Sequence, residues 1–120
     1  MLYEYSPTRL QKDYENEKIM KKKYGVAISE GILKLLGAIL AADNAYDLKC
    51  IKSLFMEHLK DNLKEYYSIS LDKKKSKWRI ILQMLDDEGN VLIPTDNEKE
   101  FLMSVKRIRI KELSEHYVEY

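Results

Sequence analysis

The chain has 120 residues, of which 45% are hydrophobic and 34% charged, and its formal net charge is +1. This length and composition indicate one globular domain, residues 1–120, with enough apolar side chains for a core. No apolar run approaches the roughly 18 residues that a bilayer requires, and the first residues lack the pattern of a signal peptide. Because Cys50 is the single cysteine, we expect a cytoplasmic protein in which Cys50 is a small buried hydrophobic residue.

Basic residues are concentrated in two segments, although the total charge is close to neutral. Seven bases and three acids lie from Lys60 to Arg79, and four bases with no acid lie from Val105 to Lys111. A face that collected these bases would attract phosphate groups. The ordinary alternative is that a lysine-rich segment is simply solvated surface.

The N-terminal part predicts one strand and two helices. Residues 2–6 alternate in polarity, as in a strand, and residues 6–25 predict a helix with Ser6 as N-cap, Pro7 at its first position and Gly25 as its stop. A second helix is predicted over 26–42 by apolar residues at helical spacing. Those residues are Ile28, Ile32, Leu35, Leu36 and Ile39.

Gly31 and Gly37 interrupt the second predicted helix, and each costs about 1 kcal/mol relative to alanine. We therefore expect another backbone to approach the helix closely at these positions. Two helices joined at Gly25 would form a helical hairpin.

The C-terminal part changes from helical to strand periodicity. Residues 43–64 predict irregular or briefly helical structure, and strands follow over 66–71, 77–85 and 104–113. The side chains expected to face the core are Tyr67, Ile69, Leu71, Trp78, Ile80, Leu82, Met84, Ile108 and Ile110. Residues 72–76 predict a hairpin connection and 86–90 a turn. A short helical turn near residue 98 would have Thr95 and Glu98 as a capping box.

Helices followed by strands indicate an α+β fold, in which an N-terminal helical hairpin packs on one face of a small, mainly antiparallel sheet. The other face of the sheet would then be a concave, basic surface. It would carry Ser68, Ser70, Arg79, Arg107 and Arg109.

Four segments, in order and spacing, carry a family resemblance. They are "EKIMKKKYG" with "ILKLLGAILAADNAYDL", then "HLKDNLKEYYSISL", "KWRIIL" and "SVKRIRIKELSEHY". Together they resemble the HigB-like, or plasmid-maintenance killer, branch of the RelE/ParE toxin superfamily. The sequence departs from that family in its loop, where Asp61 and Glu65 replace glycines. Its histidine, His58, is shifted by one residue, so that Glu57 stands in the family's histidine position.

The resemblance implies the toxin of a type II toxin–antitoxin system, a ribosome-dependent mRNA endonuclease that causes growth arrest. It implies cleavage by the RNA 2′-hydroxyl without a metal or another cofactor. The implied partners are the ribosome with its mRNA and a cognate helix-turn-helix, HigA-like antitoxin. Operator DNA would be bound only through the antitoxin, and no membrane is involved. Two alternatives are a gyrase-inhibiting toxin on the same fold and a non-catalytic RNA- or ribosome-binding module.

This reaction needs a base for the 2′-hydroxyl, an acid for the leaving 5′-oxygen and cations for the phosphorane charge. Arg79 is our first choice as a cation because its planar fork binds two phosphate oxygens at once, and it occupies the family's arginine position. Lys60 is the second phosphate ligand, and His116 is the acid or base. Other candidate proton carriers are Tyr117, Glu112 and Glu115.

A second set of residues is expected to bind RNA without taking part in the chemistry. It consists of Lys64, His58, Tyr66, Lys77, Arg107 and Arg109. Tyr66 could stack on an unpaired base, as aromatic side chains beside basic groups do, whereas its neighbour Tyr67 is expected in the core.

Overall fold

The computed structural model describes residues 1–6, 9–71 and 78–114, with the backbone alone for Arg9 and for residues 112–114. Its helices are α1 (Arg9–Tyr14), α2 (Glu17–Tyr24), α3 (Val26–Ala41), α4 (Ala45–Lys49) and α5 (Glu98–Ser104), with short 3₁₀ turns at Lys52–Leu54 and Asp61–Leu63. Its strands are β1 (Leu2–Tyr5), β2 (Glu57–His58), β3 (Tyr66–Ser70), β4 (Arg79–Leu85) and β5 (Arg107–Ser114). Pro7 and the connection predicted at 72–76 lie outside the described residues.

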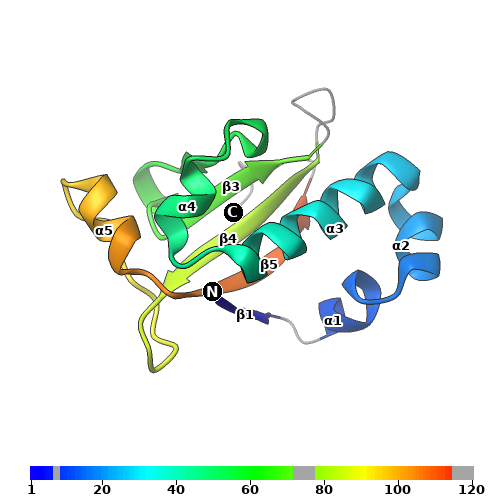
Figure 1. Cartoon of the computed structure of the whole chain (residues 1–120), viewed down its shortest axis with the longest axis horizontal. Coiled ribbons are helices and arrows are strands. Elements are labelled where there is room, and N and C mark those ends of the chain that lie inside the picture. The colour runs from blue at the N-terminus through cyan, green and yellow to red at the C-terminus, as the bar shows by residue number, and fades with distance from the viewer. Residues whose placement is uncertain (7–8, 72–77, 115–120) are drawn as a thin grey trace.

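The five strands form one mixed sheet in the order β1-β5-β4-β3-β2. Strand β1 runs parallel to β5, and the other neighbouring pairs are antiparallel. Helix α3 crosses one face of the sheet, and α2 lies alongside α3 beyond the turn at Gly25 (Figure 1). The predicted α+β class and the mainly antiparallel sheet are therefore confirmed.

Strand β4 shows how the sheet divides its side chains between two faces. Ile80, Leu82 and Met84 belong to the main core together with the buried stripe of α3 and residues of β3 and β5. We call this side the helix face. The opposite side, which we call the loop face, is defined on β4 by Arg79, Ile81, Gln83 and Leu85, because successive side chains of a strand point in opposite directions.

The first predicted helix is two helices. It breaks at Asn16, whose side chain accepts a hydrogen bond from the backbone N–H of Ile19 at 3.2 Å and thereby caps α2. Asparagine is favoured at an N-cap because its oxygen satisfies an N–H that has no partner within the helix. The predicted stop is confirmed, since Gly25 has φ +86° and its N–H donates to the carbonyl of Lys21.

Helix α3 confirms the predicted stripe, all of which is buried. The reason proposed for its glycines is wrong. A Cβ on Gly31 would lie 3.3 Å from the Cβ of Leu71, so the close neighbour there is a side chain, and a Cβ on Gly37 would meet nothing within 4 Å.

Two further expectations are wrong. Helix α5 is capped by Asn97, whose side chain accepts from the N–H of Glu100, and not by Thr95 with Glu98. Cys50 is exposed at the end of α4 and is not part of the core.

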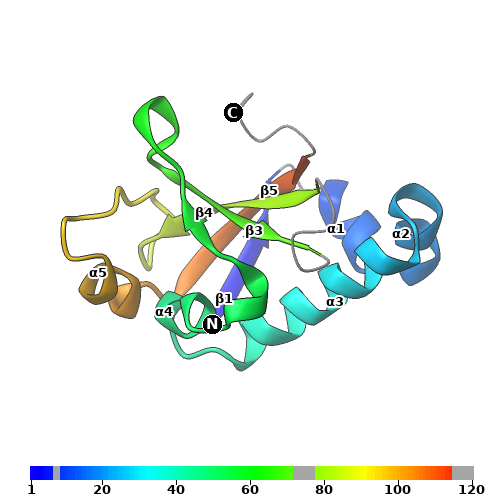
Figure 2. The same ribbon diagram turned by 90° about the horizontal axis from the view of Figure 1, so that it is seen from above.

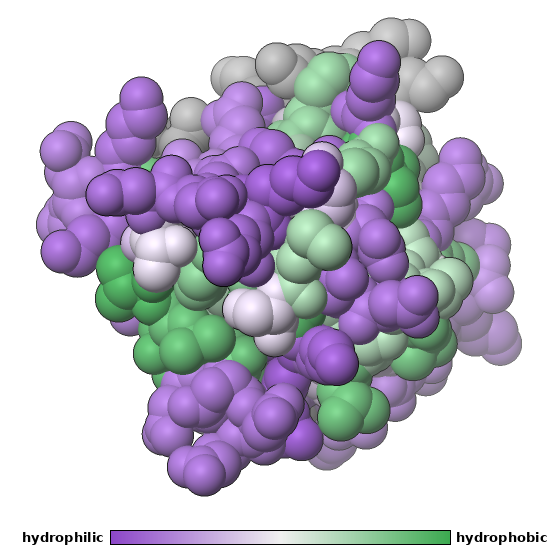
Figure 3. Space-filling view, turned by 60° about the vertical axis from the view of Figure 1, so that its left-hand side comes forward, coloured by the Kyte–Doolittle hydropathy of each residue, from purple (hydrophilic) through white to green (hydrophobic). Residues whose placement is uncertain are grey.

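Within the described part of the chain, no helix has both the length and the apolar character needed to cross a membrane. The end of the molecule that carries α5 is covered largely by hydrophilic side chains, with hydrophobic ones in separate patches (Figure 3).

Candidate functional site

Loop 59–65, between β2 and β3, is anchored on the loop face of the sheet. Leu59 and Leu63 are buried against Ile81 of β4 in a second, smaller core cluster, and Tyr66 packs against the same cluster. The backbone N–H of Leu59 donates to the carbonyl of Tyr66 at 3.0 Å, which closes the base of the loop. The loop projects on the side of the sheet opposite α3 (Figure 2).

The anchored loop presents two lysines. Lys60 and Lys64 are exposed at either end of the 3₁₀ turn Asp61–Leu63. The turn is held by hydrogen bonds from the N–H of Leu63 to the carbonyl of Lys60 and from the N–H of Lys64 to that of Asp61. Their backbone is therefore fixed, while their side chains remain accessible to an anion.

Asp61 has φ +58°, in the left-handed region. Aspartate visits this region more readily than most residues because its short polar side chain can form local hydrogen bonds. Glycine is the residue that adopts positive φ most freely. Asp61 thus keeps a backbone conformation typical of glycine while adding a negative charge to the loop.

Arg79 lies on the same face as this loop. In the register of the sheet, Arg79 pairs with Ser70 of β3 and with Ser114 of β5, and it lies two residues before Ile81 on β4. Residues two apart in a strand are separated by about 7 Å, so Arg79 begins close to the side chain on which the loop packs. Arg79 is half-buried, and its Nη1 donates to the carbonyl of Trp78 at 3.2 Å. The structure therefore brings Arg79 and the Lys60 loop to one region of the loop face.

His58 is not on this face. It pairs with Tyr67 in the sheet, and its ring stacks on the Tyr67 ring with centroids 4.9 Å apart and an angle of 23° between the planes. Its Nε2 is 2.6 Å from the backbone carbonyl of Lys64. A carbonyl oxygen only accepts, so Nε2 carries a proton and donates it. His58 therefore contacts the loop from the helix face.

The two neighbouring tyrosines divide as expected. Tyr67 is fully buried, and burial together with the nearby Glu98 raises its pKa well above the usual value. Tyr66 is half-buried on the loop face, where burial and then the hydrogen bond and charge of Glu65 raise its pKa. Tyr66 is thus a protonated, neutral aromatic group beside the lysine loop, suited to stacking rather than to accepting a proton.

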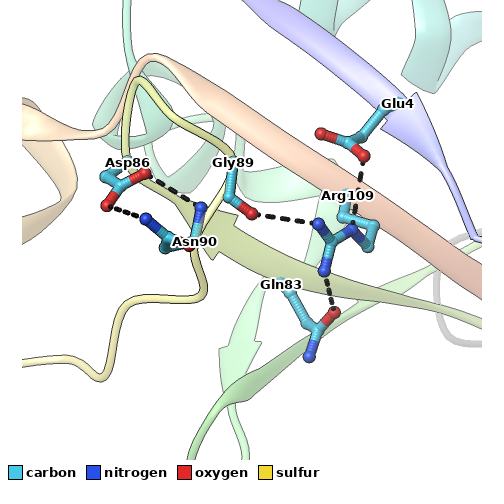
Figure 4. Close-up of polar contacts among 6 residues, drawn as sticks. All are labelled: Glu4, Gln83, Asp86, Gly89, Asn90 and Arg109. Atoms are coloured by element: carbon cyan, nitrogen blue, oxygen red, sulfur yellow. Dashed lines mark hydrogen bonds and ion pairs between the residues drawn. The ribbon is translucent and has the colours of Figure 1, made fainter.

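Arg109, predicted to bind RNA, is engaged in an internal network. Its guanidinium pairs with Glu4 of β1 at 3.5 Å, donates to the side chain of Gln83 at 3.5 Å and donates to the carbonyl of Gly89 at 3.0 Å (Figure 4). Its side chain is 22% exposed. Arg109 thereby ties β1, β4 and the predicted turn at 86–90 together. Arg107 is also partly buried on the loop face, opposite Leu85.

The remaining candidates lie outside the described side chains. Lys77, Glu115, His116 and Tyr117 belong to segments that the structure does not describe, and Glu112 is described only by its backbone, which pairs with Ile81. Among the side chains that are described, no group of three or more histidines, cysteines, aspartates and glutamates could hold a metal ion.

Sequence reasoning missed the residues that place the loop. Leu59 and Leu63 are not among the predicted site residues, although a pair of leucines spaced by four in an otherwise polar segment, "EHLKDNLKE", indicates an apolar contact.

Comparisons of the chain with models of known protein families, with curated proteins and with solved structures find no match.

Proposed function

We propose that this chain is an endoribonuclease of the HigB-like kind, the toxin of a type II toxin–antitoxin pair, acting on mRNA at the ribosome. The observation that carries the proposal is the placement of Arg79 and the Lys60 loop on one face of the sheet. The loop is held there by Leu59 and Leu63, independently of any bound ligand. Two cationic side chains on one face suit a phosphodiester better than either would alone.

In this proposal each residue has a defined task. A base takes the proton of the RNA 2′-hydroxyl as its oxygen attacks the phosphorus. The bond from phosphorus to the 5′-oxygen breaks and an acid protonates that oxygen, so that a cyclic phosphate and a 5′-hydroxyl result. Arg79 binds two phosphate oxygens, and Lys60 adds a second positive charge as the phosphorane forms. Tyr66 supplies a neutral ring on which a neighbouring base can stack. His116 remains the proposed proton carrier, with Tyr117, Glu112 and Glu115 as alternatives.

The proposed class also specifies partners. A helix-turn-helix antitoxin of the HigA-like kind would neutralise the protein and alone would contact operator DNA. The ribosome would present the message to the loop face. These partners come from the sequence resemblance, and a small helix-turn-helix gene beside this one would be the simplest support for them.

The test is cleavage of message on translating ribosomes by the purified protein. We expect fragments with cyclic or 3′-phosphate ends, and a loss of cleavage of about a hundredfold or more in Arg79→Ala. Arg79→Lys should recover only part of the activity because a lysine cannot bind two oxygens in one plane. Lys106→Ala, which removes an exposed base next to β5, is the matched control and should cleave normally. Cleavage that survives in Arg79→Ala would remove Arg79 from the site.

A second candidate is a non-catalytic RNA-binding module that uses the same face. It is favoured by the position of His58, because this histidine is occupied on the helix face and does not face the lysine side chains. Binding of single-stranded RNA without cleavage, by wild type and by a His116→Ala variant alike, would select this candidate. Intact message with inhibited DNA supercoiling would instead select a gyrase-inhibiting toxin.

A further inference from the structure

Loop 59–65 is held by three different ties. The backbone hydrogen bond between Leu59 and Tyr66 closes its base, and the packing of Leu59 and Leu63 on Ile81 sets it on the sheet. The third tie is the hydrogen bond from His58 to the carbonyl of Lys64. It is the one that reaches the C-terminal end of the 3₁₀ turn, at Lys64, whereas Lys60 lies at the N-terminal end and is joined to the turn by the N–H of Leu63.

The side chain that makes this third tie is itself fixed. His58 stacks on the buried ring of Tyr67, whose hydroxyl donates to Glu98 at 3.5 Å. Glu98 pairs with Lys49 at 3.6 Å, and Lys49 donates to the carbonyl of Met56 at 2.8 Å, two residues before His58. The contacts form a closed circuit through β2, β3, α5 and α4. The imidazole therefore has a fixed place from which its Nε2–H is aimed at the loop.

Strand alternation decides what this histidine can do. His58 shares its face with Tyr67, whereas Glu57 shares its face with Ser68 and hence with Ile81 and Arg79. A phosphate bound by Arg79 and Lys60 would lie across the sheet from the imidazole. Its Nε2 proton is also committed to the Lys64 carbonyl.

We infer that His58 is a positioning residue, which holds the Lys64 carbonyl and so keeps Lys60 and Lys64 where RNA phosphate is met, and that it transfers no proton in the reaction. The effect on RNA rests on the proposed function. The effect on the loop does not, and the two can be measured separately.

Two substitutions separate the two contacts of His58. His58→Phe keeps a ring to stack on Tyr67 and loses the donor, whereas His58→Gln loses the ring and places an amide donor at a similar reach. The loop is read in the free protein by hydrogen exchange of the Leu63 and Lys64 amides. We expect these amides to exchange about two- to tenfold faster in His58→Phe, which is the change in rate that the loss of one hydrogen bond produces. In His58→Gln the exchange rate should be nearly unchanged. Equal exchange in wild type and His58→Phe would overturn the inference.

The RNA measurements use the same two variants with message on translating ribosomes. We expect kcat/KM to fall about two- to tenfold in His58→Phe, to be recovered in His58→Gln, and to keep the shape of its pH profile in both. A profile that loses one limb, with both variants equally inactive, would make His58 a proton carrier and overturn the inference. If wild type does not cleave RNA, the proposed function fails, and the exchange measurement still decides whether His58 positions the loop.

Discussion

Asp61 offers the sharpest test of how the loop is built. Its φ of +58° lies where a side chain normally crowds the following carbonyl and where glycine is the favoured residue. We predict that Asp61→Gly leaves the protein at least as stable as wild type and that Asp61→Ala destabilises it. Alanine suffers the same crowding as aspartate but has no polar group with which to offset it.

The magnitude follows from two opposing terms. The left-handed conformation costs an ordinary residue roughly 1–2 kcal/mol, and aspartate less. Glycine removes that cost, but it also gives the unfolded chain more freedom, and this lowers the free energy of unfolding by about 0.4–1 kcal/mol. The free energy of unfolding should therefore change by about 0 to +1 kcal/mol in Asp61→Gly and by about −1 kcal/mol in Asp61→Ala. A difference of 1 kcal/mol corresponds to about 4 °C in Tm for a domain of this size.

The matched control is Asp87, an exposed aspartate in a turn whose φ is not positive. There the order should reverse, with alanine more stable than glycine by about 0.4–1 kcal/mol. Urea denaturation of the four variants and wild type gives all the values needed. If the glycine variant is less stable than the alanine variant at both positions, Asp61 does not have the left-handed conformation, and the description of the loop is wrong.

Three further predictions concern the frame around the site. Gly37→Ala should raise the free energy of unfolding by about 1 kcal/mol, because the added Cβ would meet nothing within 4 Å. Gly31→Ala should raise it by less, because the added Cβ would lie 3.3 Å from Leu71. Equal gains in the two variants would contradict this prediction. Arg109→Ala should lower the free energy of unfolding by about 1–2 kcal/mol, because its three contacts are lost. Lys106→Ala is the control and should change the free energy of unfolding by close to zero. If denaturation does not distinguish the two variants, Arg109 lies at a solvated surface. The pKa of Asp86 is lowered from 3.8, chiefly by a backbone N–H four residues later, so its ionised form stabilises the fold above pH 3.8 and that contribution is lost as the pH falls through the lower folded value. Asp86→Asn should accordingly lose less stability than wild type between pH 5 and pH 2, and parallel curves would rule out this contribution.

Periodicity was enough to predict most of the fold. The stripe of α3 and the alternation of β4 are patterns of many residues, so one exception does not alter them. The break at Asn16 and the cap at Asn97 depend on single side chains that bond to the backbone. Near Asn97 a threonine, Thr95, competes for the same role, and the sequence alone does not decide between them.

The parallel pairing of β1 with β5 explains why the fate of Arg109 could not be predicted. A strand pattern assigns Arg109 to the polar face, which the structure confirms, but it does not reveal which other side chains share that face. Glu4 reaches it from the opposite end of the chain, and Gly89 reaches it from the turn after β4. An arginine surrounded by such partners stabilises the fold, and its charge is partly neutralised by Glu4.

The loop shows that a one-residue shift can change a role completely. In a strand, moving a side chain by one position transfers it to the other face of the sheet, and His58 is shifted by one residue from the position that the resemblance leads one to expect. Its stacking on Tyr67 and its bond to Lys64 are what a histidine can do from that side. For the proposed RNA cleavage on the loop face, we therefore expect the proton carrier to be another residue. Variants of His116 and Glu112 on the His58→Gln background, in which we expect the loop and its lysines to be held as in wild type, would identify that carrier without changing the proposed phosphate ligands.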